Sequence, residues 1–316
     1  MKRILSILSL LFIINACDDG DLTIDTIDFS EVTAKKCDLK DIIYKVKDSE
    51  MLILAIPATT FPNDQTPEGT PITLPINSSN QVIYRQYNGP VSSDNICPTV
   101  PSATPSLTEE WKATAGTIQI TSTALYAPIT SNGTKIIKYN HYIVFKNVTF
   151  QTPNGTQVYE NYIFGNYTTD ATALAFGFDG EVQKSSCDNR IFNFNGSEAL
   201  ILNVADYATL FENAVTVTPR KAIIGSDNKL TYQLYNNQVT DAYFCATTPP
   251  TTPTLSQEWK AVDGVTDVSG IIEVSTTTLG NDFQHTIRLK KVTFKRGNST
   301  FYLGDDVLYG SFITTP

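Results

Sequence analysis

The chain has 316 residues, and its 23 Lys and Arg against 32 Asp and Glu give a formal net charge of −9. Binding to DNA or RNA depends on cations that neutralise phosphates, so this acidic composition argues against a nucleic-acid partner. The length exceeds that of a typical single domain, so more than one hydrophobic core is expected.

The N-terminus has the pattern of a bacterial export signal. Two cations precede an almost wholly apolar run over residues 4–14, which is too short to span a bilayer. Cys17 follows Ala16, as the acceptor cysteine follows a small residue in a lipobox, although Asn15 departs from the usual residue at −2. We therefore predict a lipoprotein signal peptide over residues 1–16 and a lipid on Cys17 that anchors the protein to the membrane.

Residues 17–36 contain few large apolar side chains, which predicts a lipidated cysteine followed by a flexible tether. The acidic cluster Asp18-Asp-Gly-Asp21 resembles the export signal that carries Bacteroidota lipoproteins to the outer face of the outer membrane. We expect a lipid-anchored outer-membrane protein exposed at the cell surface. The alternative is a solvated linker in a lipoprotein that faces the periplasm.

The rest of the chain is typical of an all-β protein. Short segments rich in β-branched and aromatic residues alternate with turn signals, and no segment shows sustained helical periodicity. The predicted strands include Met51–Ile56, Gln81–Tyr87, Thr117–Thr123, Tyr139–Phe150, Lys229–Tyr235, Ile271–Thr278 and Phe283–Phe294.

Five cysteines are present, and four remain if Cys17 carries lipid. Their nearly equal spacings favour two disulfides in an oxidising compartment, Cys37–Cys97 and Cys187–Cys245. Each would close a loop of roughly 60 residues, worth about 4 kcal/mol at the upper end. The alternative is four buried free thiols.

The chain also repeats itself at an offset of 148 residues. The segment 49–54 returns as 197–202, and Leu107–Ala113 returns as Leu255–Ala261. This pattern predicts two tandem copies of one domain.

We expect two tandem antiparallel β-sandwiches, Ig-like or jelly-roll-like, over residues 37–178 and 179–316, with one disulfide each. Trp111 and Trp259 follow the second cysteine of each copy, whereas an Ig domain proper places its tryptophan between the two cysteines. We expect both indoles to be core anchors.

Two long segments, His141–Phe150 and His285–Phe294, change the phase of their apolar alternation part-way along. A strand cannot switch faces without a bulge or a crossing between layers. We predict bulges near Lys146-Asn147 and Lys290-Lys291; the alternative is a strand buried on both faces.

No catalytic, cofactor or metal site is predicted. Each copy has a single histidine, His141 or His285, whereas metal and triad sites need several convergent groups. Two acid pairs could suggest a glycosidase dyad: Glu50 with Glu110, and Glu198 with Glu258. Because both pairs occur in both copies, we expect them to support the fold, for example through cross-strand contacts with Lys112 and Lys260.

Tyrosines that differ between the copies are the candidates for a ligand surface. Phe283, Thr286, Val307 and Phe312 occupy the places of Tyr139, Tyr142, Tyr162 and Tyr167. Exposed aromatic side chains stack on sugar rings or anchor protein contacts. The alternative is a tyrosine-rich face packed against its own neighbours.

The cysteines, the Tyr-x-x-Tyr motif and the Glu-Trp-Lys-Ala motif, carried twice behind a lipobox, resemble a group of uncharacterised tandem-repeat surface lipoproteins from Flavobacterium-type Bacteroidota. That resemblance implies a location and no activity. The architecture is also similar to the glycan-capturing lipoproteins of starch-utilisation systems, which is an analogy of fold. We expect a non-catalytic surface interaction or structural module with a protein or glycan partner; a glycan-binding lipoprotein is the alternative, and a hydrolase is third.

Overall fold

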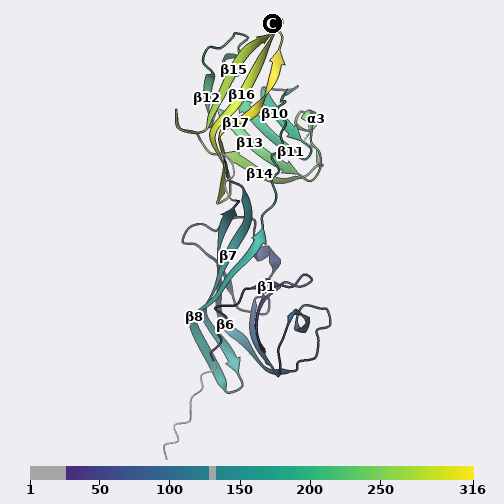
Figure 1. The fold of residues 1–316 in the computed structure, drawn as a ribbon, viewed down its shortest axis with the longest axis vertical. Helices are drawn as coiled ribbons and strands as arrows, with labels where there is room; N and C mark the ends of the chain where they lie inside the picture. The colour runs from purple at the N-terminus through teal and green to yellow at the C-terminus, as the bar shows by residue number, and fades with distance from the viewer. Residues whose placement is uncertain (1–25, 128–132, 249) are drawn as a thin grey trace, which may run out of the picture.

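The computed structural model describes residues 26–127, 133–248 and 250–316. The predicted signal peptide, Cys17 and the first part of the tether lie outside the described residues. The prediction of an all-β chain is confirmed, since the described part is built of antiparallel strands with two four-residue helices, α2 (Tyr207–Leu210) and α3 (Asp241–Phe244). The strands form two sheets in two lobes stacked along the long axis of the molecule (Figure 1).

We call residues 26–170 the first unit. Its sheet has the order β1-β2-β3-β5-β6-β7-β8, with β4 paired to β6. The strands are β1 (Lys35–Lys36), β2 (Ile42–Lys47), β3 (Glu50–Ala55), β4 (Ile72–Pro75), β5 (Gln81–Tyr87), β6 (Leu107–Tyr126), β7 (Ile136–Thr152) and β8 (Gly155–Asp170).

We call residues 174–316 the second unit. Its sheet has the order β12-β15-β16-β14-β13-β11-β10-β9, with β17 paired to β16. The strands are β9 (Gln183–Lys184), β10 (Arg190–Asn195), β11 (Glu198–Val204), β12 (Arg220–Ile223), β13 (Asn228–Tyr235), β14 (Leu255–Ala261), β15 (Ile271–Leu279), β16 (Asp282–Arg296) and β17 (Ser299–Thr314). The single long strand β6 of the first unit corresponds to two shorter strands, β14 and β15, in the second unit.

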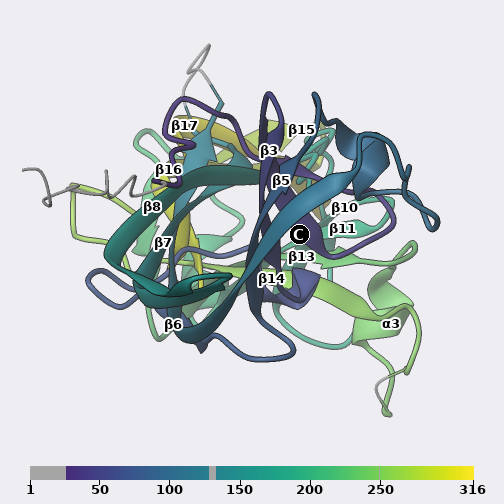
Figure 2. The same cartoon turned by 90° about the horizontal axis from the view of Figure 1, so that it is seen from below.

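Each sheet bends over itself and encloses a core, as in a sandwich. In the first unit the first half of β6 pairs with β5 and its second half pairs with β4, with register irregularities between Ala113 and Thr117. Gly116 lies at this bend with φ +113°, and a Cβ there would come within 2.8 Å of the Asn147 carbonyl oxygen. The close approach of β6 and β7 therefore requires a glycine. Figure 2, seen along the long axis, shows β7 and β8 curving away from β3 and β5.

The bulge predicted near Lys146-Asn147 is present. Thr117 on β6 pairs with Lys146 on β7, and Ala115 on β6 pairs with Thr149 on β7. Between these two pairs β7 has one residue more than β6. Asn147 takes φ +50°, and Lys291 takes φ +49° at the corresponding place on β16. The extra residue turns the apolar side chains that follow it back toward the core, which explains the phase change in the sequence.

Both predicted disulfides are formed, Cys37–Cys97 and Cys187–Cys245. In the first unit the bond holds a loop over the outer face of β2, β3 and β5, where it covers Tyr44, Met51 and Ile53. Because β3 also faces the main core, it is buried on both faces and its apolar run does not alternate.

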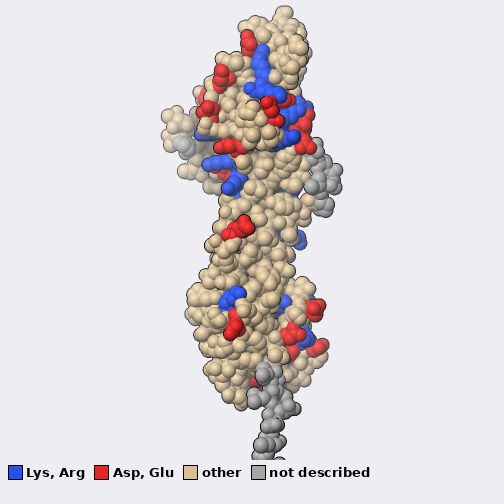
Figure 3. Space-filling model, turned by 90° about the vertical axis from the view of Figure 1, so that its left-hand side faces the viewer, with Lys and Arg blue, Asp and Glu red and all other residues tan. Residues whose placement is uncertain are grey.

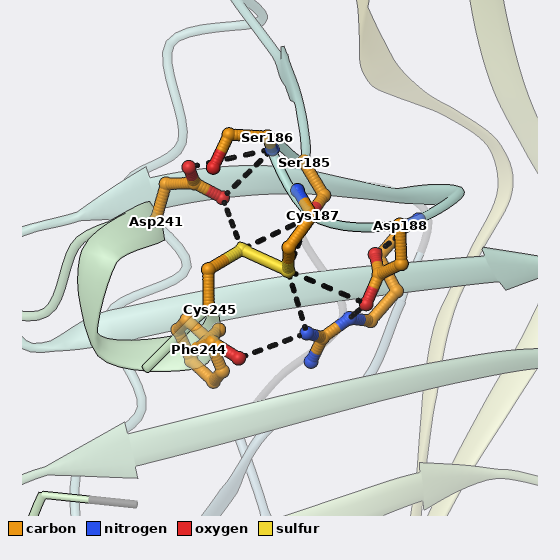
Figure 4. Close-up of polar contacts among 8 residues, drawn as sticks. Ser185, Ser186, Cys187, Asp188, Asp241, Phe244 and Cys245 are labelled. Atoms are coloured by element: carbon orange, nitrogen blue, oxygen red, sulfur yellow. Dashed lines mark hydrogen bonds and ion pairs between the residues drawn. A yellow bond between two sulfur atoms is a disulfide. The ribbon is translucent and has the colours of Figure 1, made fainter. Parts of the chain in front are cut away.

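In the second unit the disulfide joins the end of α3 to the loop before β10 (Figure 4). Asp241 accepts from the Ser186 backbone N–H, and the Arg190 guanidinium donates to the Phe244 carbonyl at 3.0 Å while pairing with Asp188 at 2.7 Å. These contacts attach α3 to the sheet, and aromatic side chains fill the space beneath it.

The tether prediction is wrong from residue 26 onward. Ile27 and Phe29 insert into the first core, where Phe29 meets the Tyr84 ring edge-on. In the second unit Phe176 stacks on Tyr232 with ring centroids 4.3 Å apart. Residues 174–178, which the sequence assigned to the first copy, thus pack in the second core. Short Ile-x-Phe and Leu-x-Phe segments thus complete each core, and segments this brief show no periodicity from which burial could be predicted.

Candidate functional site at the junction of the two units

The two histidines are fully buried and hold neighbouring strands together. His141 contacts Ser122 Oγ through Nδ1 at 2.8 Å and Thr169 Oγ1 through Nε2 at 2.9 Å. Burial lowers the pKa of His141 to about 4 and also lowers the pKa of His285. Both rings are therefore neutral at pH 7, in agreement with the structural role expected from the sequence.

The two acid pairs do not form dyads. Glu50 accepts a hydrogen bond from the Tyr84 hydroxyl, whereas Glu110 pairs with Arg85 at 2.7 Å. Because Tyr84 and Arg85 are neighbours on β5, their side chains point to opposite faces of the sheet, and so do the two glutamates.

The second unit repeats this arrangement. Glu198 contacts Tyr232 and Glu258 contacts Gln233. Ion pairs with the lysines are present, at 3.0 Å for Lys112–Glu110 and 3.1 Å for Lys260–Glu258, but each joins residues of one strand, so the prediction of a cross-strand contact with a lysine is wrong. Burial favours a higher pKa for Glu258, but hydrogen bonds from Gln233 and Lys260 outweigh it and lower that pKa. The acids thus serve the fold.

The four candidate tyrosines do not share an exposed surface, so that prediction is wrong. Tyr139 is 1% exposed and Tyr162 is 8% exposed, and Tyr162 stacks on Phe145 inside the core. Tyr167 packs beside His141, and only Tyr142 is open to solvent. Because side chains alternate between the two faces of β7 and β8, these tyrosines lie in different environments. A comparison of the two copies shows where residues differ but does not show which face each residue occupies.

Trp111 and Trp259 are core residues, as predicted, with 4% and 2% exposure. The Trp111 indole N–H donates to Glu109 Oε1 at 2.6 Å, and the Trp259 indole N–H donates to Gln257 Oε1 at 3.0 Å. Neither indole is exposed on the surface of its unit. Among the described residues no three His, Cys, Asp or Glu side chains gather to hold a metal ion. In the same part of the chain, no helix has the length and apolar character needed to cross a membrane.

The turn between β16 and β17 docks onto the first unit. Ser299 is fully buried there, and its hydroxyl donates to Asp64 Oδ1 at 2.7 Å. Asp64 also accepts from the Asn298 backbone N–H at 3.1 Å, and Tyr139 Oη lies 3.2 Å from Ser299 Oγ. Tyr139 therefore differs from Phe283 in the other copy because it has a partner across the junction.

A second set of contacts extends the junction along the hairpin. The Thr134 N–H donates to the Tyr302 carbonyl at 2.7 Å, and the Tyr302 N–H donates to Thr134 Oγ1 at 2.8 Å. Tyr126 Oη donates to the Thr300 carbonyl at 2.7 Å, and Arg296 donates to the Asn63 carbonyl. Directional hydrogen bonds from several separate segments fix the two units relative to each other.

A cavity of about 220 Å³ lies beside this hairpin, between the units. The Arg296 guanidinium lies over the Trp259 ring, 5.0 Å from its centroid, and the buried Nε of Arg296 has no hydrogen-bond partner. The lining residues come from both units and from the linker between them: Asn63, Lys135, Ile136, Ile137, Tyr139, Ala171, Thr172, Ala173, Leu174, Phe176, Gln257, Trp259, Arg296 and Phe301. We call this the junction cavity.

Of the residues that line the junction cavity, only Tyr139 was predicted from the sequence to bind a ligand, and it was predicted as an exposed aromatic side chain. A usable signal was present, because Arg296 and Phe301 also differ from their counterparts in the first copy, Thr152 and Gln157.

Comparison with protein-family models, with curated proteins and with solved structures gives no match for this chain.

Proposed function

We propose that the protein is a lipid-anchored, non-catalytic interaction module on the outer face of the outer membrane. The lipobox around Cys17 and the acidic residues after it support the location. The observation that carries the proposed role is the hydrogen-bonded junction, which joins two sandwiches into one elongated body (Figure 1). Such a body holds its second unit away from the anchor.

The order of the units relative to the anchor follows from the start of the described chain. The Ile27 N–H donates to Tyr159 Oη at 3.0 Å, and Tyr159 lies near the β7–β8 turn, at the end of the first unit away from the junction. An anchor at Cys17 would therefore attach on that side. The second unit would be the outer one.

The outer end of the second unit carries exposed branched side chains. Thr216 hydrogen-bonds to Thr276, which places the segment around it beside β15, and the β15–β16 turn lies at the end of β16 opposite the junction. The exposed side chains here are Val215 at 57%, Val217 at 102%, Leu279 at 51% and Ile313 at 52%. Apolar side chains gathered at one end of a protein suit contact with another protein. In Figure 3 the extreme tip of this end is uncharged on the face in view, and charged side chains of both signs gather just below it on the second unit.

Site-specific photocrosslinking on intact cells tests this role. A crosslinker at Val217 should yield a discrete adduct with one partner protein, whereas a crosslinker at Val100, 84% exposed on the first unit, should not. An Ile313→Asp change should reduce the Val217 adduct several-fold. Identical adduct patterns from Val217 and Val100 would contradict the assignment of the outer end.

A glycan-binding lipoprotein is the second proposal, favoured by the aromatic side chains of the junction cavity. A glycan array probed with the purified protein separates the two proposals, since specific capture of a glycan would place this function first. A hydrolase has the least support, because the acid pairs considered for it lie on opposite faces of their sheets.

A further inference from the structure

The size of the junction cavity limits what it can hold. An apolar protein cavity of about 150 Å³ accommodates benzene. The junction cavity, at about 220 Å³, has room for one ring with a short substituent. Tyr139, Phe176, Trp259 and Phe301 supply aromatic surface to its wall, which suits a ring-shaped apolar body.

The charged groups of the cavity are all of one sign. Lys135 and Arg296 line it, no Asp or Glu does, and neither cation forms an ion pair with a described residue. The Arg296 Nε–H is buried without a partner. Apart from the hydrogen bond to the Asn63 carbonyl, the Arg296 guanidinium, which has five N–H donors, has no protein acceptor among the described residues.

The first unit shows that the fold does not need this cation. At the corresponding places it has Glu109 beside Trp111, Thr152 in place of Arg296 and Gln157 in place of Phe301. In the second unit Gln257 stands where the first unit has Glu109, so this position supplies no carboxylate to neutralise Arg296. Charge and aromatic surface thus change together at one site, a pattern that core packing alone does not require.

We propose that the junction cavity binds a small monocarboxylate with a single aromatic ring, of the arylacetate class. The carboxylate accepts from Arg296 and is attracted by Lys135, and the ring lies against the aromatic wall. A guanidinium is suited to this task because it stays charged and presents several N–H donors in one plane. Since Lys135 belongs to the first unit and Arg296 to the second, the bound acid also ties the two units together. This proposal is independent of the lipid anchor and of the partner at the outer end.

Isothermal titration calorimetry on the purified full chain tests the proposal, with phenylacetate and 4-methylphenylacetate as ligands. Both acids should bind, phenylacetamide should bind at least tenfold more weakly because it lacks the charge, and glucuronate should bind at least tenfold more weakly because its ring is polar. Arg296→Gln should weaken phenylacetate at least tenfold, whereas Lys295→Gln, an exposed neighbour on β16, should leave it unchanged. Gln257→Glu, which restores the acid found in the first unit, should have the effect of Arg296→Gln.

Three results would overturn the proposal: no heat from either acid at millimolar concentration, equal binding of phenylacetate and phenylacetamide, or equal losses in Arg296→Gln and Lys295→Gln. Glucuronate binding as tightly as phenylacetate would refute the aromatic ligand and favour a sugar acid. Circular dichroism spectra of the variants show whether each is folded. Should Arg296→Gln fail to fold, Phe301→Gln provides the test, since it installs the first unit's residue and should weaken phenylacetate while retaining the cation.

Discussion

Tyr139 of the first unit and Ser299 of the second lie with their hydroxyl oxygens 3.2 Å apart, and both side chains are shielded from solvent. Ser299 also donates to Asp64, so three side chains from three segments meet at one buried point. Thr66 and Thr216 make equivalent hydrogen bonds, to Ser122 and to Thr276, so the counterpart of Asp64 in the second copy is Ala214. The counterpart of Tyr139 is Phe283, and neither of these residues has the polar group. The polar side chains at this point thus belong to the junction and are not required by the sandwich.

Asp64→Ala should loosen the junction. The change removes a charged acceptor and leaves the Ser299 hydroxyl without this partner, at a cost of about 2 kcal/mol. Scanning calorimetry should show the two units unfolding in separate transitions where the unaltered chain unfolds in one. Asp170→Ala, at a largely exposed carboxylate, is the matched control and should leave the thermogram unchanged. A single transition in Asp64→Ala would mean that the units are coupled by other contacts.

Trp111→Ala should destabilise the first unit strongly. The indole is 4% exposed and packs in the main core, so its truncation should cost about 3–5 kcal/mol and lower the melting temperature by many degrees. The native emission should be blue-shifted and poorly quenched by iodide. Strong quenching together with near-normal melting of the variant would show an exposed tryptophan.

Acid should destabilise the fold through the histidines. The folded-state pKa of His141 is about 4, below its ordinary value of 6.5, so the unfolded chain takes up a proton first as the pH falls. The stabilising contribution is complete above pH 6.5 and is lost between pH 6.5 and 4, at most about 3 kcal/mol. Urea unfolding at several pH values measures this slope, and His141→Gln should flatten it. An unchanged slope in the variant would assign the acid sensitivity to other groups.

Cys17 should carry lipid. The apolar run before it and the small Ala16 motivate this expectation. Metabolic labelling with a fatty-acid analogue should tag the protein in its native host, and Cys17→Ala should abolish the label. Equal labelling of both proteins would refute lipidation at this residue.

Much of the fold could be predicted from the sequence because the bulge, the disulfides and the buried tryptophans each leave a pattern within a short stretch of the chain. The bulge was visible as a phase change in the apolar pattern of His141–Phe150, since a bulge is the local way for a strand to change faces. The disulfide pairs followed from two nearly equal spacings, and the burial of Trp111 and Trp259 followed from their fixed place after the cysteines. Each of these features depends on residues within one copy.

The features that the sequence by itself determined are thus the strand content, the pairing of the cysteines and the two tryptophan-centred cores. Only the tertiary structure decided where Tyr139 and Arg296 point, because their partners, Ser299 and the carbonyl of Asn63, are more than 150 residues away in the chain. The burial of Phe29 was also decided by the tertiary structure, because its partner Tyr84 belongs to a strand that is distant in the sequence. Alternation and spacing report contacts within a strand or a loop, whereas a junction and its cavity arise when surfaces from two separate units meet.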